Sequence, residues 1–495
     1  MAVNNIIKRI QNIMRQDAGI NGDAQRIEQM TWMFFLKVYD TQEETWEYKD
    51  ENYKSIIPED LRWRKWAVDE KDGEALTGEA LLSFVNEKLF PTLKNLPIDA
   101  NTPRAKSIVQ ETFADLNQYM KNGTLLRQVV NIVNEIEFDD ADDRHTFGDI
   151  YEGILKDLQS AGNAGEFYTP RALTDFIVMM LDPKLGETFG DFTSGTGGFL
   201  TSALKVLDAQ VQTVEDRTVY SNSIYGIEKK ALPFLLCATN MLLHDIDNPR
   251  IIHGNSLEKN VREYKESDRF DVILMNPPYG GNEKEGVKQN FPADLRSSET
   301  ADLFMSVIMY RLKQNGRCAI ILPDGFLFGT DNAKMAIKEK LLSEFNLHTV
   351  IRMPHSVFAP YTSITTNILF FDRTHPTTET WFYRLDMPEG YKNFSKTKPM
   401  KLEHFAPTVE WWDNREEITI DGFDKAKKYT VEELKARSYN IDLCGYPHEE
   451  EEILPPKELI QQYQEKRASL NADIDRILAQ ITDILGIDIT EEGDE

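Results

Sequence analysis

The chain has 495 residues, of which 82 are acidic and 56 basic, so its formal net charge is -26. Its length argues against a single core and predicts roughly two to four domains, and its charge disfavours unaided binding to a polyanion. The three cysteines lie far apart and form no CxxC pair, which predicts a protein without a zinc site or a disulfide framework. The sequence shows no signal-like start and no apolar run of about 20 residues, so we expect a cytoplasmic protein without a membrane span.

Residues 1–145 are rich in helix-patterned segments, and the clearest of them covers residues 27–39. Apolar residues of this segment lie three or four positions apart, as on a buried helix face: Ile27, Met30, Phe34 and Val38. The acidic stretch 135–144 is poor in apolar residues and marks a domain boundary. We therefore expect an N-terminal helical domain, residues 1–145, that packs on the rest of the chain.

A glycine-rich segment at residues 189–200 has the pattern of a loop between a strand and a helix. Its spacing differs from GxGxxG, and no GxxxxGK[ST] occurs in the chain, so a phosphate-binding P-loop is not expected. Glycines let the backbone approach a ligand closely. The candidate ligand-binding residues of this loop are Asp191, Thr193, Ser194, Gly195, Thr196 and Gly197.

Two further strand ends carry polar residues. The segment 223–228 ends in Glu228, and the segment 251–257 places Asn255 and Ser256 after a third strand. In nucleotide-binding α/β folds an acid at the second strand end accepts hydrogen bonds from ribose hydroxyls. The glycine-rich loop, the acid at the second strand end and the amide after the third strand therefore predict a site for an adenosine-bearing cofactor. The cofactor would lie across the carboxyl edge of a parallel sheet.

The most informative segment is Asn276-Pro277-Pro278-Tyr279, which follows the apolar run 270–275. Proline donates no amide hydrogen and fixes its φ, so the strand stops abruptly. The Asn276 side-chain oxygen and the Pro277 carbonyl would be two acceptors, and Tyr279 would offer a flat face. This arrangement suits an aromatic exocyclic amine, although the same residues also suit a simple turn.

Apolar runs at 317–322, 347–351 and 366–371 alternate with helical patterns, which predicts a mostly parallel sheet covered by helices within residues 146–400. The remaining region, residues 401–495, ends in a long helix after an acidic, proline-containing linker. Apolar residues line one side of that helix, interrupted by Arg467: Ile460, Tyr463, Leu470, Ile474, Ile477, Ile481 and Ile484. Such a line needs a partner, and we expect this helix to dock another subunit.

Together these motifs resemble the adenine-N6 DNA methyltransferases, specifically the modification subunits of type I restriction-modification systems. Segments 165–171 and 319–328 resemble family segments before the glycine loop and after the catalytic tetrapeptide. Phe192 departs from the wider superfamily, which often has proline there. The resemblance implies a Rossmann-like α/β methyltransferase sheet that binds S-adenosylmethionine, with Asp191, Gly195 and Gly197 at its methionine end. It implies a cover over the cofactor formed by Glu166, Phe167, Tyr168, Thr169, Pro170 and Arg171.

The resemblance also implies direct methyl transfer to N6 of an adenine flipped out of DNA, with the segment 276–279 as the catalytic residues. It also implies a separate specificity subunit as a partner, which agrees with the acidic net charge of the chain. A restriction subunit and a second copy of the chain are further partners that it implies. Three alternatives remain open. They are methylation of cytosine N4 or protein glutamine by the same fold, a non-catalytic scaffold, and an NAD-dependent oxidoreductase.

Overall fold

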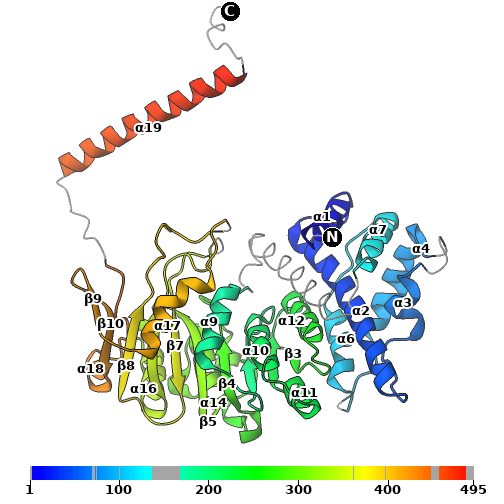
Figure 1. Cartoon of the computed structure of the whole chain (residues 1–495), viewed down its shortest axis with the longest axis horizontal. Coiled ribbons are helices and arrows are strands. Elements are labelled where there is room, and N and C mark those ends of the chain that lie inside the picture. The colour runs from blue at the N-terminus through cyan, green and yellow to red at the C-terminus, as the bar shows by residue number, and fades with distance from the viewer. Residues whose placement is uncertain are drawn as a thin grey trace, which may run out of the picture. The chain divides into compact units, whose positions relative to one another are not determined.

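The computed structural model describes residues 3–69, 73, 75–99, 101–136, 168–359, 362–395, 397–447 and 456–485. The chain divides into two compact units, Met1–Gly445 and Tyr446–Glu495. The first unit contains a set of N-terminal helices and a ten-stranded sheet (Figure 1). Within the described ranges, no helix is both long and apolar enough to cross a lipid bilayer.

The N-terminal region is helical, as predicted. Its helices are α1 (Val3–Met14), α2 (Asp23–Lys49), α3 (Trp63–Trp66), α4 (Gly78–Ser83), α5 (Phe90–Lys94), α6 (Arg104–Ala114) and α7 (Gly123–Asn134). The predicted helix at 27–39 lies inside α2 and is confirmed, but more than one face is buried, since Trp32 and Phe35 are also fully enclosed. The reason is that α2 packs both on its helical neighbours and on α12 (Ala231–Leu243) of the sheet region.

Polar contacts fix the N-terminal helices to the sheet region. The Asp247 carboxylate accepts hydrogen bonds from Gln42 Nε2 at 2.6 Å and from Trp46 Nε1 at 3.1 Å. Arg104 Nε donates to the carbonyl of Ile251 at 3.0 Å. Ile251 belongs to β3 (Ile251–His253), the edge strand of the sheet. The N-terminal helices therefore pack on the sheet region, as expected from the sequence, and cover its open edge.

The sheet has the order β3-β2-β1-β4-β5-β7-β6-β8-β10-β9. Its other strands are β1 (Phe189–Asp191), β2 (Ile224–Glu228), β4 (Phe270–Met275), β5 (Leu312–Pro323), β6 (Asn346–Arg352), β7 (Thr366–Asp372), β8 (Glu379–Arg384), β9 (Ile418–Ile420) and β10 (Phe423–Thr430). From β3 to β5 all neighbours are parallel, whereas β7 is antiparallel to both β5 and β6. The parallel half has the strand order of a Rossmann-like fold, which confirms the predicted fold class.

Helices cover both faces of the sheet. Besides α12 they are α9 (Arg171–Leu181), α10 (Gly198–Asp208), α11 (Val214–Ser221), α13 (Glu285–Lys288), α14 (Thr300–Arg311), α15 (Asp324–Phe328), α16 (Asn332–Glu344), α17 (Ala406–Asp413) and α18 (Val431–Ala436). Along β4, Val272 and Leu274 join the core built with α9, α10 and α12, whereas Ile273 and Met275 join the core built with α14 and α16. A strand buried on both faces is continuously apolar, which explains the run at 270–275.

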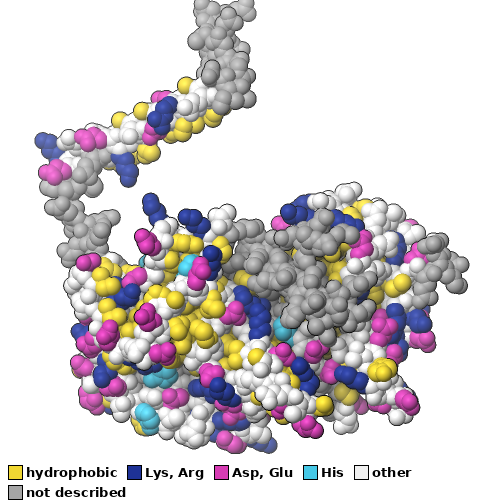
Figure 2. Space-filling model, in the orientation of Figure 1, with side chains coloured by type: hydrophobic (Ala, Val, Ile, Leu, Met, Phe, Trp, Pro, Cys, Tyr) yellow, Lys and Arg dark blue, Asp and Glu magenta, His cyan; other side chains and the backbone are white. Residues whose placement is uncertain are grey.

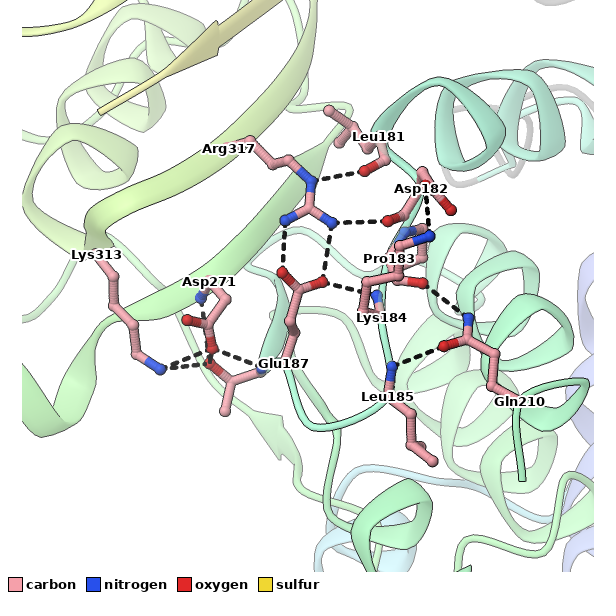
Figure 3. A network of polar contacts seen from close by, with 11 residues as sticks. Leu181, Asp182, Pro183, Lys184, Leu185, Glu187, Gln210, Asp271, Lys313 and Arg317 are labelled. Atoms are coloured by element: carbon pink, nitrogen blue, oxygen red, sulfur yellow. Dashed lines mark hydrogen bonds and ion pairs between the residues drawn. The ribbon is translucent and has the colours of Figure 1, made fainter. Parts of the chain in front are cut away.

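A polar network braces the part of the sheet near the amino ends of β1 and β4 (Figure 3). The Arg317 guanidinium donates to both oxygens of Glu187, at 2.6 and 2.8 Å, and to the carbonyl of Leu181 at 2.6 Å. Lys313 Nζ lies 2.7 Å from Oδ2 of Asp271. These contacts join β5 to β4, to the segment before β1 and to the end of α9. They therefore fix the strands whose carboxyl ends form the opposite edge of the sheet.

The chain beyond residue 400 contributes to the same sheet, because β10 pairs antiparallel with β8. The predicted boundary at residue 400 falls between β8 and β9. The second unit contains α19 (Pro456–Leu485), which confirms the predicted terminal helix. Figure 2 shows apolar side chains in a row along this helix. Those about half exposed or more are Ile460, Tyr463, Leu470, Ile474, Ile477, Leu478 and Ile481.

Candidate active site

A cavity of about 260 Å³ lies at the carboxyl ends of β1, β2 and β4. The predicted site residues that line it are Thr169, Asp191, Thr193, Ser194, Gly195, Thr196, Glu228, Asn255, Ser256, Asn276 and Pro278. Six further predicted residues lie outside this lining, namely Tyr168, Pro170, Arg171, Gly197, Pro277 and Tyr279, and Glu166 and Phe167 lie outside the described residues. The cavity therefore joins the glycine-rich loop to the segment 276–279.

The glycine-rich loop is held in shape by hydrogen bonds from its main-chain amides to the end of β2. The amide of Gly195 donates to Glu228 Oε2 at 2.9 Å, and the amide of Ser194 donates to the carbonyl of Ile227 at 3.0 Å. Gly197 has a φ of +84°, and a Cβ atom there would lie 3.0 Å from the Cys237 sulfur. Glycine is needed at this position because a side chain would be both strained and crowded. The loop leads directly into α10.

Two buried carboxyl groups line the cavity beside the glycine-rich loop. Asp191 is 1% exposed and Glu228 is 8% exposed. Burial, reinforced by the nearby charge of Glu228, raises the pKa of Asp191 from its ordinary value of 3.8 to about 8. Burial also raises the pKa of Glu228, although its Oε1 accepts from the amide of Lys230 at 2.8 Å. A cationic or hydroxyl-bearing ligand would relieve the cost of ionising these groups.

Asn276 also lines the cavity and lies directly after β4. Its Nδ2 donates to Thr169 Oγ1 at 3.1 Å, and its Oδ1 accepts a hydrogen bond from the Tyr279 hydroxyl. Thr193 Oγ1 donates to the Asn276 carbonyl at 3.3 Å. The predicted acceptor oxygen is thus engaged by the Tyr279 hydroxyl of the same tetrapeptide. The sequence did not indicate this contact.

Asn255 and Ser256, which follow β3, also line the cavity. Ser256 is 5% exposed, and its hydroxyl donates to the carbonyl of Phe192 at 2.6 Å. Asn255 Oδ1 accepts from the amide of Leu257 at 3.1 Å. Both side chains are therefore held by main-chain groups. Asn255 keeps an amide group at a wall that a flat heterocycle could approach.

Arg171 anchors the beginning of α9. Its Nη1 donates to the carbonyl of Gly198 at 2.9 Å and also contacts the Thr201 hydroxyl. These groups belong to the first turn of α10. Arg171 therefore joins two helices behind the glycine-rich loop, and Tyr168, two residues before Pro170, is buried.

Phe192, the departure from the superfamily pattern, packs in a cluster beside the site. Its ring lies 5.5 Å from that of Phe270 at an interplanar angle of 65°. The guanidinium of Arg311, which is 4% exposed, lies 4.1 Å from the centre of the Phe192 ring. Arg311 also lies 5.1 Å from the Tyr225 ring. Phe192 thus contributes to an aromatic enclosure around a buried cation.

Sequence reasoning missed part of the cavity wall. Residues not predicted but present there include Lys229, Lys230, Gly254, Gly281, Asn282, Glu283, Thr300 and Phe304. The amide of Thr300 donates to the carbonyl of Gly281 at 3.1 Å, which folds the segment after Tyr279 back onto α14. Lys229 could have been found as the residue after a strand end. Thr300 and Phe304 carry no local signal, because they reach the site only through the tertiary fold.

Comparisons with known proteins agree with this architecture. The family model described as N-6 DNA Methylase matches residues 142–453, and the HsdM N-terminal domain matches residues 3–133. The methylase subunit of the type I restriction enzyme EcoEI from Escherichia coli is 50% identical over 493 residues, which is 98% of each chain.

Two solved structures extend the match. A modification subunit assigned to a type I restriction enzyme from Vibrio vulnificus YJ016 is 41% identical, with a TM-score of 0.77 over 88% of this chain and 93% of that chain. A chain from a structural study of the assembly of a type I restriction-modification system is 35% identical, with a TM-score of 0.79 over 99% of both chains. The resemblance drawn from the motifs is confirmed. This chain belongs to the N-6 DNA methylase family, among the methylase subunits of type I restriction enzymes.

Proposed function

We propose that this chain transfers a methyl group from S-adenosylmethionine to N6 of an adenine in DNA, as the catalytic subunit of a type I restriction-modification complex. The observation that carries this proposal is the shared cavity. Asn276 and Pro278 line the same space as Gly195 and Glu228. Methyl transfer needs the reacting atoms about 3–3.5 Å apart, and a single cavity permits that approach.

The cofactor side suits S-adenosylmethionine, which supplies a methyl group on a positively charged sulfur when bound. We assign Asp191, Gly195 and Gly197 to its methionine end, Glu228 to the ribose hydroxyls, and Asn255 or Ser256 to the adenine edge. Asp191 and Glu228 are buried carboxyls with raised pKa values, which fits a ligand with cationic groups. The other loop residues, Thr193, Ser194 and Thr196, line the same wall.

The catalytic side would act on a planar amine. We propose that the Asn276 side-chain oxygen and the Pro277 carbonyl accept hydrogen bonds from the two N6 hydrogens and turn the nitrogen lone pair toward the methyl group. The nitrogen gains the methyl and releases one proton to solvent, without a covalent enzyme intermediate. Positioning and electrostatics supply most of the acceleration. Tyr279 stacks on the flipped base, and its hydroxyl leaves Asn276 when the base enters.

Variants at Tyr279 separate its ring from its hydroxyl. Tyr279→Phe keeps the stacking face, so kcat and KM for DNA should stay within about threefold of wild type. Tyr279→Ala removes a stacking interaction of roughly 1–3 kcal/mol, so KM for DNA should rise about tenfold to a hundredfold. Steady-state kinetics with the reconstituted complex measure both parameters. Equal effects of the two variants would show that the hydroxyl, and not the ring, is the important group.

Cofactor binding should depend on pH through Asp191. Its raised pKa of about 8 means that the carboxyl is mainly protonated below that pH, so a cationic ligand has to displace a proton. The affinity for S-adenosylmethionine should therefore rise between pH 6 and 7.5, by at most about tenfold per pH unit. Calorimetry in buffers of different ionisation enthalpy measures the affinity and the released proton.

Asp191→Asn is the matched control for this pH dependence, because it keeps the shape of the side chain and removes the ionisation. This variant should bind more weakly and show a flatter pH profile. A wild-type affinity that does not change over this pH range, without proton release, would contradict the assignment of Asp191.

The net charge of this chain and the apolar side of α19 both bear on its partners. A chain with a net charge of -26 needs a DNA-reading partner to bind duplex well. We propose that the specificity subunit supplies this surface and that the apolar side of α19 packs against an apolar helix of that subunit. A restriction subunit and a second copy of this chain would complete the assembly. We also propose that this chain has three functional divisions, residues 1–145, 146–400 and 401–495. Its three buried free thiols suggest a reducing compartment, and we propose that the protein is located in the cytoplasm.

Two experiments separate the alternatives. Calorimetric titration with S-adenosylmethionine and with NAD distinguishes a methyltransferase from an oxidoreductase, and we expect binding of the former alone. Transfer of labelled methyl groups to DNA by the chain with its specificity subunit excludes a scaffold role. Label found in protein instead of DNA would favour the glutamine alternative.

A further inference from the structure

We propose that Thr169 is a positioning residue for methyl transfer, whose hydroxyl holds the Asn276 amide with its oxygen toward the target amine. The inference rests on the proposed function, because it concerns how the catalytic acceptor is aimed. Its basis is the hydrogen bond from Asn276 Nδ2 to Thr169 Oγ1, 3.1 Å long. Both residues also line the cavity.

The chemistry of an asparagine side chain explains why such a partner is needed. The amide has an accepting oxygen at one end and two N–H donors at the other, and a half turn about its last bond exchanges them. The hydrogens of an aromatic amine require the oxygen of Asn276 to face them. The Nδ2 group then points away and needs an acceptor, which the Thr169 hydroxyl provides. Valine at position 169 would keep the shape but leave this donor without its acceptor.

The segment that contains Thr169 is held in place by a contact with α10. It lies two residues before Arg171, which donates to the carbonyl of Gly198 at 2.9 Å. Gly198 is the first residue of α10. Since α10 follows the glycine-rich loop, the position of Thr169 is set by the helices that also set the cofactor wall.

Once the target amine has displaced the Tyr279 hydroxyl from its Oδ1, Asn276 is held at two points. Thr193 Oγ1 donates to its main-chain carbonyl at 3.3 Å, while Thr169 accepts from its side chain. The two hydroxyls come from different segments of the chain, one after β1 and one before α9. Together they fix both the backbone and the amide plane of Asn276, so loss of the Thr169 hydroxyl frees the amide plane alone.

The test uses the complete complex with its specificity subunit, labelled S-adenosylmethionine and target DNA. Thr169→Val should lower kcat about tenfold to a hundredfold, because a misplaced catalytic group slows transfer without removing it. The calorimetric Kd for S-adenosylmethionine and the KM for DNA should stay within about twofold. Thr169→Ser, which restores the hydroxyl, should return kcat to within about threefold of wild type.

Thr174→Val is the matched control, because it makes the same change at a nearby threonine that does not contact Asn276. The Thr174 hydroxyl instead donates to the Arg171 carbonyl and lies 2.8 Å from the Ser202 hydroxyl. Its kcat should stay near that of wild type. The inference is overturned if Thr169→Val has wild-type kcat, if it loses only cofactor affinity, or if Thr174→Val loses as much kcat. Absence of methylation by the wild-type complex would instead remove the proposed function, so the two failures can be told apart.

Discussion

Asn276→Ala should lower kcat for DNA methylation by about 10²–10³-fold or more, to the limit of detection in an ordinary assay, while S-adenosylmethionine still binds within about twofold of wild type. The proposed role of this side chain is to accept a hydrogen bond that strengthens as the amine becomes tetrahedral. Loss of one preorganised group of that kind costs about 10²–10³ in rate. The cofactor contacts are assigned to other residues, so the Kd measured by calorimetry should change little.

Asn255→Ala is the matched control for this prediction, since it removes the same amide from another residue that lines the cavity. It should weaken cofactor binding and, at saturating S-adenosylmethionine, leave kcat within a few-fold of wild type. Normal methylation by Asn276→Ala would show that its assignment is wrong. Equal loss of cofactor affinity in both variants would show that the two sides of the cavity are not functionally distinct.

The second large effect should come from α19. The double variant Ile474→Glu/Ile481→Glu should weaken association with the specificity subunit at least about a hundredfold, as should deletion of residues 457–495. Both isoleucines are about half exposed on the same side of the helix. An interface that covers them would have to bury two unpaired carboxylates, and the desolvation of each costs several kcal/mol. Co-purification and size-exclusion chromatography of the mixed subunits measure the loss.

The control places the same two charges on the other side of α19. Ala472→Glu/Ala479→Glu changes exposed positions roughly opposite the isoleucines and should assemble as wild type does. All variants should keep their affinity for S-adenosylmethionine. If the isoleucine variant assembles normally, the docking role of α19 is wrong, and equal loss from both double variants would indicate a general effect of charge.

The parallel half of the sheet and most of the cavity wall could be predicted from local signals. The run 270–275 is continuously apolar because helices cover both faces of β4. Gly195 and Asn276 follow strands, Glu228 is the last residue of β2, and the carboxyl ends of parallel strands meet at one edge. The local sequence patterns therefore predict that these residues lie close together, although they indicate no particular contact between them.

The features that escaped prediction depend on contacts between distant segments. Thr169 and Asn276 are 107 positions apart, and nothing in either motif indicates their hydrogen bond. Trp32 is fully enclosed because α2 has neighbours on several sides, a condition that a single apolar stripe does not reveal. The short strand β9 and the largely polar β10 extend the sheet beyond residue 400, and partial exposure leaves them without an apolar pattern.

The measurement that tests the central claim most directly is mass spectrometry of nucleosides from DNA incubated with the wild-type complex and S-adenosylmethionine that carries a deuterated methyl group. The shared cavity predicts deuterated N6-methyladenine, and at least about a hundredfold less of it from the Asn276→Ala complex in the same time. Label confined to N4-methylcytosine, or no label in DNA from a complex that binds both cofactor and DNA, would contradict the account.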